Sequence, residues 1–235
     1  MKRDAGLDLV KWLALLTMLV DHLRHLWPQA QDELFMLGRL AFPLFCLGIA
    51  ANVRRSRSGE LFTPNNARYL AWLVAFSVIS ELPYQWLSTQ SSSLNIMPTL
   101  TLGLLVAWAV HHQSQSASLL GAAGIAAGAL LHDVLMYGVF GVLLPASLVI
   151  ALKRSGVFWL LPAVVSVLAN SRNRWSDGLS FDTIGNSVVV EFMAPLLGLW
   201  LLRAGFTWRV WPVGRWGYFF YPIHLLLLTM IRAVL

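Results

Sequence analysis

The chain has 235 residues, of which 57% are hydrophobic and only 12% are charged. Ordinary soluble domains carry about 25% charged residues, so this composition excludes a soluble protein of the usual kind. The formal net charge of +6 does not indicate nucleic-acid binding, because the Lys and Arg residues lie in short loops between apolar runs, where they determine membrane topology.

Apolar runs recur along the whole chain, and a window of about 19 residues separates nine of them. We predict an all-α protein: a polytopic bundle of about nine transmembrane helices, with eight or ten as alternatives, in a single domain that covers residues 1–235. Helices are expected because backbone groups in lipid must be hydrogen-bonded within their own segment. The predicted spans are residues 8–27, 34–52, 69–88, 97–112, 118–132, 134–152, 156–170, 187–203 and 216–234.

Basic residues are concentrated in alternate loops, which predicts the orientation. By the positive-inside rule the N-terminus is cytoplasmic, in the inner membrane of a bacterium, and with nine spans the C-terminus lies outside. An exception is the mixed-charge loop at about 170–186, which contains Arg172 and Arg174. The residues that set this orientation are Lys2, Arg3, Arg54, Arg55, Arg57, Arg68, Lys153, Arg154, Arg203, Arg209 and Arg215.

The first predicted span is rich in ionisable residues, and a charge inside a span is a functional hypothesis by default. Lys11 and His22 are eleven positions apart, which places them on one helix face about 16 Å apart along the axis. Leu15 and Met18 lie on the stripe between them. Lys11 would hold the phosphates of coenzyme A, the pantetheine arm would follow the stripe, and His22 would act as a general base. The ionisable residues are Asp8, Lys11, Asp21, His22 and Arg24.

The competing interpretation of this span is structural. Lys11 would extend to the cytoplasmic interface, and His22 would be an interfacial histidine or a hydrogen-bonded histidine of the core. The second span raises the same choice at Arg39, which would either pair with a carboxylate such as Asp21 or Glu81, or stabilise negative charge on a reacting thioester.

Polar residues continue through the later spans, and we expect them to line a polar cavity. Tyr221 and His224 share one helix face at i, i+3, whereas His111 and His112 are expected to lie in a loop. Gly121, Gly124 and Gly128 predict close helix packing. Neither the histidines nor the lone Cys46 forms a pattern that predicts a metal site. The expected cavity residues are Glu81, Tyr84, Asn95, Asp133, Glu191, Tyr221 and His224.

These segments together resemble the TraX family, whose named member is the F-pilin acetylase. The Asp21-His22 pair followed by the pattern R-x-A-F-P-L-F is the most specific part, and the resemblance covers essentially the whole chain. It rests on the segments LDLVKWLALLTMLVDHL, GRLAFPLFCLGIAAN, ISELPYQW, NIMPTLTLG, DVLMYGVFGVLLP and YPIHLLLL.

The resemblance implies a membrane enzyme that acetylates the N-terminal amine of a pilin subunit with acetyl-coenzyme A (acetyl-CoA). In this interpretation His22 is the base, Asp21 or Glu81 orients it, and Lys11 and Arg39 bind the cofactor. The chain also resembles, more distantly, the acyltransferase-three group, which O-acylates cell-envelope glycans. That group has Arg where this chain has Lys11, a change that keeps the charge but loses the bidentate contact with phosphate.

Three alternatives to the N-acetyltransferase remain open. One is an O-acetyltransferase whose acceptor is the hydroxyl of a cell-envelope glycan instead of an amine. A secondary transporter would also contain buried charges, but it usually shows an internal repeat, which this sequence lacks. A pilus assembly protein would need no cofactor stripe.

Overall fold

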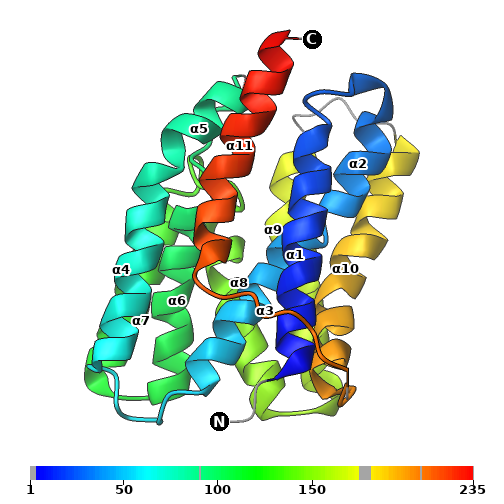
Figure 1. Ribbon diagram of the computed structural model, residues 1–235. Coiled ribbons are helices and arrows are strands. Elements are labelled where there is room, and N and C mark those ends of the chain that lie inside the picture. Colours follow the sequence, from blue (N-terminus) through cyan, green and yellow to red (C-terminus); the bar gives the residue numbers. More distant parts are fainter. Residues whose placement is uncertain (1–3, 90, 175–180, 207, 235) are drawn as a thin grey trace.

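The computed structural model describes residues 4–89, 91–174, 181–206 and 208–234, and the side chains of residues 172–174 and 181–184 lie outside that description. All regular structure in these ranges is helical (Figure 1). The helices are α1 (Ala5–Leu23), η1 (Pro28–Ala30), α2 (Gln31–Gly38), α3 (Ala41–Arg54), α4 (Pro64–Ile79), α5 (Glu81–Leu87), α6 (Ile96–His112), α7 (Gln115–Leu130), α8 (Gly138–Lys153), η2 (Gly156–Trp159), α9 (Leu160–Arg174), α10 (Phe181–Arg203) and α11 (Trp216–Val234).

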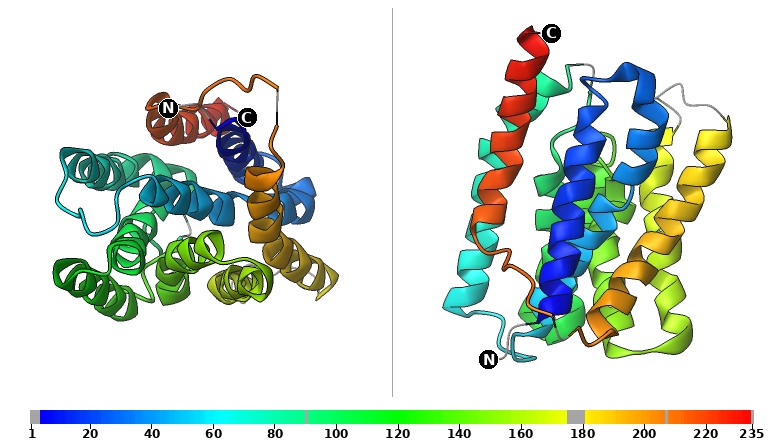
Figure 2. Two further views of the ribbon diagram at one scale, coloured as in Figure 1. Left: turned by 90° about the horizontal axis from the view of Figure 1, so that it is seen from below. Right: turned by 45° about the vertical axis from the view of Figure 1, so that its right-hand side comes forward.

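The described helices traverse the bundle nine times, because α2 with α3 and α4 with α5 each make one broken rod. The chain begins at the lower end in Figure 1 and finishes at the opposite end. In both views of Figure 2 the rods run alongside one another, with α1 between α11 and α10. The last helix coincides with the predicted span at 216–234.

Two predicted spans, each given as one continuous range, contain a break. The span at 34–52 is interrupted between Gly38 and Ala41, and the span at 69–88 is interrupted at Ser80. A proline has no N–H to donate to the carbonyl four residues earlier and its ring clashes with that carbonyl. Pro43 removes this bond at Arg39, and Pro83 removes it at Ile79, so each break lies one turn before a proline.

Three helices of the described chain are long and apolar enough to cross a membrane: Pro28–Arg54, which includes the break, Gly185–Arg203 and Trp216–Val234. Four shorter helices are apolar as well: Ile96–His112, Gln115–Leu130, Gly138–Lys153 and Gly156–Ser171. Helix α1 carries Asp8, Lys11 and Asp21 along its length. The protein therefore has the character of a helical membrane protein.

Small residues bring α7 close to its neighbours, as predicted. A Cβ atom at Gly121 would collide with the side chain of Ala109 in α6. At Gly124 it would come within 3.1 Å of the Leu102 carbonyl oxygen, and at Gly128 within 3.0 Å of Val142 in α8. The glycines thus let α7 pack directly on α6 and α8, as small residues do between membrane helices.

The prediction that His111 and His112 lie in a loop is wrong. Both are buried in the last turn of α6, which continues to His112 and ends where Gln113 adopts the left-handed conformation (φ 54°). The Nε2 atom of His111 donates a hydrogen bond of 3.0 Å to the Ser56 carbonyl oxygen. This contact fastens the loop after α3 to α6, so the role of His111 is structural.

Candidate functional site

A pair of buried histidines from the first and last helices forms the centre of the site. His22 lies in the last turn of α1 and His224 in α11. His22 Nδ1 and His224 Nε2 are 2.8 Å apart, a hydrogen-bond distance between residues 202 positions apart in the chain. Both side chains are buried.

The hydrogen bonds of this pair fix where its protons lie. His224 Nδ1 is 2.8 Å from the Phe220 carbonyl oxygen, which only accepts, so His224 Nδ1 carries a proton. A neutral imidazole has one donor and one acceptor nitrogen, and Nε2 of neutral His224 therefore accepts from the Nδ1–H of His22. His22 Nε2 is then left with a lone pair, as a general base requires.

The carboxylate predicted to orient His22 is used elsewhere. Asp21 accepts a hydrogen bond of 3.1 Å from Arg39 Nη2, and the same pair forms a buried ion pair. Arg39 Nη1 also donates to Asn170 Oδ1 at 3.2 Å, and the Arg39 guanidinium lies 4.0 Å from the centre of the Phe35 ring. The residue that orients His22 is accordingly His224.

A glycine lets the Asp21–Arg39 pair form. A Cβ atom at Gly38 would overlap the side chain of Asp21. Arg39 follows directly, at the break between α2 and α3. The break and the glycine together bring the guanidinium of one rod against the carboxylate of α1.

Glu81, the other carboxylate expected beside His22, organises the segment before α6. One Glu81 oxygen accepts from Asn95 Nδ2 at 2.6 Å and from the Asn95 backbone N–H at 3.0 Å, and the other accepts from Gln85 Nε2 at 2.7 Å. Asn95 in turn caps α6 through the Met97 N–H at 2.9 Å. Glu81 and Asn95 thus have a positioning role for the loop at 88–95.

A polar cleft of about 490 Å³ opens from His22 toward the end of the bundle that holds the C-terminus. Its walls come from the end of α1, from α2, from α5 with the following loop, from the turn before α8 and from the last turn of α11. Hydroxyl groups are abundant in these walls. They belong to Tyr84, Ser88, Thr89, Ser91, Ser92, Ser93 and Tyr137.

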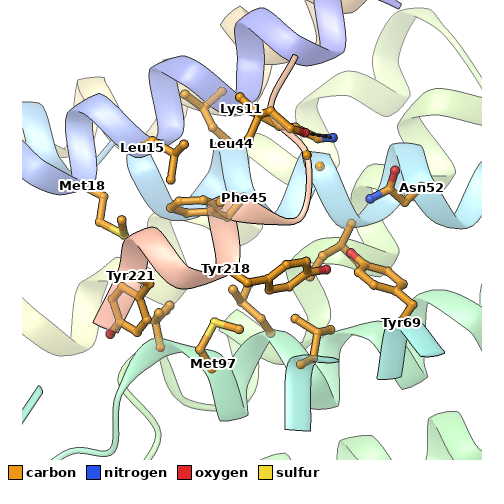
Figure 3. Close-up of a pocket in the computed structure, with 18 residues that line it drawn as sticks. Lys11, Leu15, Met18, Leu44, Phe45, Asn52, Tyr69, Met97, Tyr218 and Tyr221 are labelled. Atoms are coloured by element: carbon orange, nitrogen blue, oxygen red, sulfur yellow. Dashed lines mark hydrogen bonds between the residues drawn. The ribbon is translucent and has the colours of Figure 1, made fainter. Parts of the chain in front are cut away.

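A second cavity, apolar and about 140 Å³ in volume, lies on the other side of His22. It is lined by Lys11, Leu15 and Met18, the stripe predicted on α1, and by Tyr221 among other residues of α3, α4, α6 and α11. Figure 3 shows Lys11, Asn52 and Tyr69 toward one end of this pocket and Met18 and Tyr221 toward the other. Three polar side chains therefore lie toward the Lys11 end, and the Tyr221 hydroxyl lies toward the other end.

The linings of the two cavities are neighbours through an aromatic contact. The rings of His22, which lines the polar cleft, and Tyr221, which lines the apolar pocket, have centroids 6.4 Å apart. The predicted cofactor residues are divided between the cavities, because Lys11 lines the apolar pocket and Arg39 lines the polar cleft.

The segment before α11 forms one wall of the apolar pocket and is held by α1. Lys11 Nζ donates to the Val213 carbonyl oxygen at 3.3 Å, and Asp8 Oδ1 accepts from the Val213 N–H at 3.2 Å. Trp12 Nε1 donates to the Trp211 carbonyl oxygen at 2.9 Å. In Figure 1 this segment crosses in front of α3 before it enters α11.

The other expected cavity residues are dispersed. Tyr84 lines the polar cleft, and its hydroxyl is 2.8 Å from Ser91 Oγ. Asp133 is exposed in the turn after α7. Glu191 is fully buried in α10 but lines neither of the two cavities described here. The expectation of one cavity that gathers all these residues is therefore wrong: Tyr84 and Tyr221 line different cavities, and neither cavity is lined by Glu81, Asn95, Asp133, Glu191 or His224.

Sequence reasoning did not identify several residues of the cleft. Phe35 and Asn170, which hold Arg39, are an ordinary apolar and an ordinary amide residue in the sequence. His25 lies three positions after His22 in the sequence, and that spacing alone did not indicate that it lines the cleft. Arg232 carried a usable signal, because it is a charge in the last turn of an otherwise apolar span.

The fold and the site define a helical membrane protein with a buried histidine pair inside the bundle, close to an apolar pocket and a polar cleft. The chain belongs to the TraX family, since residues 6–232 match the family described as "TraX protein". A stretch of 77 residues is 32% identical to "Protein TraX" of Escherichia coli, which is 33% of this chain and 29% of that protein. No solved structure matches the chain.

Proposed function

We propose that the protein transfers an acetyl group from acetyl-CoA to the N-terminal amine of a pilin subunit, in the inner membrane of a bacterium. The observation that carries this proposal is the junction of two unlike cavities at His22, whose Nε2 has the lone pair of a base. Membership of the TraX family supports it.

The proposed topology has nine spans with the N-terminus in the cytoplasm. This orientation places the Lys11 end of the apolar pocket toward the cytoplasm, where acetyl-CoA is made, and the polar cleft toward the outside. The basic ends of α3 and α8, with Arg54, Arg55 and Lys153, lie at the same end of the bundle as the N-terminus. Their charge would attract the phosphates of the donor.

In the proposed complex Lys11 contacts the phosphates of acetyl-CoA, and the apolar pocket holds the pantetheine arm along Leu15 and Met18. The length of α1 between Lys11 and His22 is about 16 Å. The pocket would exclude water from the thioester, which protects it from hydrolysis. The thioester would then lie beside Tyr221, next to His22.

In the chemical step the acceptor amine approaches from the polar cleft. As its nitrogen attacks the thioester carbonyl, His22 Nε2 takes the proton that the nitrogen loses. The N–C bond forms, the C–S bond breaks, and the proton passes to the thiolate that leaves. Throughout the step, His224 Nε2 accepts the hydrogen bond from the Nδ1–H of His22. This hydrogen bond stabilises the imidazolium that His22 forms before it gives up the proton.

The Asp21–Arg39 pair has a positioning role in this scheme. The Arg39 guanidinium contacts Asp21, Asn170 and the Phe35 ring, and these contacts fix the inner wall of the cleft beside His22. This wall would determine how the acceptor approaches the base.

A second candidate acceptor is the hydroxyl of a cell-envelope glycan. The specific observation in its favour is the number of Ser, Thr and Tyr hydroxyl groups in the cleft wall, which suit a polyhydroxyl ligand. A sugar hydroxyl depends on a base far more than an amine with a pKa near 8, so the two acceptors respond differently when His22 is removed.

The test uses the purified protein with isotopically labelled acetyl-CoA and, in turn, a peptide with a free N-terminal amine, the same peptide with a blocked N-terminus, and an envelope glycan. We expect mass spectrometry to find label on the free peptide alone. Label on the glycan alone would show that the acceptor is a hydroxyl and not an amine. Failure to bind acetyl-CoA in calorimetry would favour a transporter or pilus assembly protein.

A further inference from the structure

The polar cleft carries an excess of positive charge that the transfer chemistry does not use. Among the residues that the structure describes, its walls contain three arginines, Arg24, Arg39 and Arg232, and one carboxylate, Asp21. With neutral histidines this leaves a formal excess of two positive charges. Asp21 is bonded to Arg39, so the excess belongs to Arg24 and Arg232.

Arg24 is held at the cleft wall by an aromatic ring. Its guanidinium lies 5.3 Å from the centre of the Phe35 ring, which Arg39 also contacts. Arg24 directly follows α1 and is partly exposed. A cation on a ring keeps its N–H donors in the plane of the guanidinium, where they remain able to bind an anion.

Arg232 enters the cleft from α11. Its Nη1 atom donates a hydrogen bond of 2.8 Å to the Leu87 carbonyl oxygen at the end of α5. In the described part of the chain no carboxylate lies within ion-pair distance of Arg24 or Arg232. The single carbonyl contact orients the Arg232 guanidinium and leaves four of its five donors for another ligand.

His25, which follows α1, does not add to this charge near neutral pH. A histidine of ordinary pKa, about 6.5, is mostly neutral above pH 7, and a buried imidazole is disfavoured further in its charged form. The Nε2 atom of His25 is 3.4 Å from Ser88 Oγ. The cationic character of the cleft therefore comes from arginine, whose charge persists at every physiological pH.

We propose that Arg24 and Arg232 bind a carboxylate side chain of the acceptor peptide, while the N-terminal amine of that peptide lies at His22. This inference rests on the proposed function and names its substrate class: a peptide with an acidic residue close to its N-terminus. Arginine is suited to a carboxylate because its fork of donors matches the two oxygens. The anion belongs to the acceptor because both arginines line the same cleft as His22.

The same charge selects the reactive form of the amine. A protonated amine would enter a cleft that already has an excess of positive charge and would be repelled, whereas the free amine would not. Binding through a carboxylate gives the peptide an anchor that does not require its N-terminus to be charged. The cleft thus favours the unprotonated nucleophile that the transfer step needs.

The experiment measures binding of peptides to the full-length protein in nanodiscs of zwitterionic lipid, without acetyl-CoA. Two sets of synthetic peptides carry a C-terminal fluorophore and differ only by Glu or Gln at one of positions two to four. A hydrogen bond to a charged group is stronger than one between neutral groups, so we expect the best Glu peptide to bind about tenfold more tightly than its Gln partner. High salt should reduce that preference.

Variants assign the preference to its residues. Arg24→Gln and Arg232→Gln should each remove most of the Glu preference, and Arg24→Lys should retain part of it. The matched control is Arg203→Gln, since Arg203 also lies on an aromatic ring, 4.7 Å from the centre of the Trp159 ring, but at the other end of the bundle. It should keep the full preference. Retained acetyl-CoA binding reports the integrity of each variant.

Equal binding of Glu and Gln peptides by the parent protein would overturn the proposal, and so would a Glu preference that survives both Arg24→Gln and Arg232→Gln. A preference that disappears when phosphatidylglycerol is added would assign the arginines to lipid headgroups and overturn it as well. Labelled acetyl transfer to Glu and Gln peptides with equal kcat/KM would leave the acetyltransferase standing and this inference refuted. A Glu preference without acetyl transfer would support the carboxylate site and contradict the proposed acetyltransferase function.

Discussion

The two cavities beside α1 differ in almost every physical respect. The apolar pocket, about 140 Å³, has polar side chains toward its Lys11 end, whereas the polar cleft, about 490 Å³, is lined by three arginines, an aspartate and many hydroxyl groups. One helix lines both, with Lys11 in the first and His22 in the second. The contrast suits a reaction whose two substrates differ in the same way: a thioester arm that is shielded from water and a polar acceptor that arrives from it.

The comparison also shows how charge is tolerated inside the bundle. In the apolar pocket the one charged side chain, Lys11, donates to the Val213 carbonyl oxygen. In the polar cleft the most deeply buried cation, Arg39, contacts a carboxylate, an amide and a ring. A buried charge without such partners would cost several kcal/mol, so the partners explain why these residues persist in membrane helices.

The largest expected effect comes from His22, at the junction of the cavities. His22→Ala should lower acetyl transfer by about 10²–10⁴-fold, the contribution of a positioned general base. Acetyl-CoA binding should be unchanged, since the apolar pocket is intact. The measurement is the single-turnover rate with labelled acetyl-CoA, with His132→Ala as control because His132 lines neither cavity.

The same variant separates the two acceptor classes. Raising the pH from about 6 to 9 should partly restore transfer to an amine, whose free form increases around its pKa near 8. A hydroxyl would gain little over this range. If His22→Ala transferred acetyl groups as fast as the parent protein at every pH, base catalysis by His22 would be contradicted. The two cavities would then bind their ligands without a catalytic role for His22.

Breaking the Asp21–Arg39 pair should give the next largest effect. Removing one partner of a buried ion pair costs about 3–5 kcal/mol, so Asp21→Asn and Arg39→Gln should each lower the thermal midpoint sharply. The double variant should be less destabilised than the sum of the single variants. Additive losses, measured by thermal unfolding in detergent, would show that the pair does not hold the wall of the cleft.

His224 should have a smaller effect on the same step. His224→Ala removes the acceptor that fixes the His22 tautomer, and we expect kcat to fall about 10–100-fold, as is typical when a group that orients a functional histidine is lost. The KM for acetyl-CoA should be unchanged. His224→Gln, whose amide oxygen can accept the same bond, should recover part of kcat; equal activity of all three proteins would remove His224 from the mechanism.

Much of the fold could be predicted from the sequence, because hydrophobic runs report helices directly. Helix α11 was predicted to its end residues, and the prolines that break two rods, Pro43 and Pro83, lie inside predicted spans that were given as continuous ranges. Apolar runs give the length of each helix but not its neighbours. That α1 contacts α11 through a bond between residues 202 positions apart is a property of the packed bundle.

The candidate site was predictable where one helix carries the pattern, and unpredictable where several helices meet. The stripe from Lys11 through Leu15 and Met18 follows from helix periodicity alone, and all three residues line one pocket. Of the partners of Arg39, Asp21 was a named candidate, but Phe35 and Asn170 come from α2 and α9. Nothing in the local sequence of Asn170 distinguishes it from a helix-surface amide. Side-chain partners across helices are determined by packing, which periodicity does not contain.

The smallest expected effect tests the apolar pocket. Lys11→Met keeps the length and the apolar stem of the side chain but removes its charge, and we expect the affinity for acetyl-CoA to fall about tenfold, the value of one charge-assisted contact of about 1.4 kcal/mol. Lys11→Arg should bind as well as the parent or better, because guanidinium contacts phosphate through two donors. Peptide binding in the polar cleft should be the same in all three proteins.

Lys11 also holds the Val213 carbonyl oxygen, so the loss of affinity has a second physical explanation in the displacement of the pocket wall. A truncated donor that lacks the nucleotide phosphates distinguishes these two explanations. If Lys11 contacts phosphate, Lys11→Met should weaken acetyl-CoA but leave acetyl-pantetheine, which lacks the nucleotide phosphates, at its parent affinity. Equal weakening of both donors would show that Lys11 shapes the pocket wall and that the phosphates are bound elsewhere, with the basic residues at the ends of α3 and α8 as the next candidates.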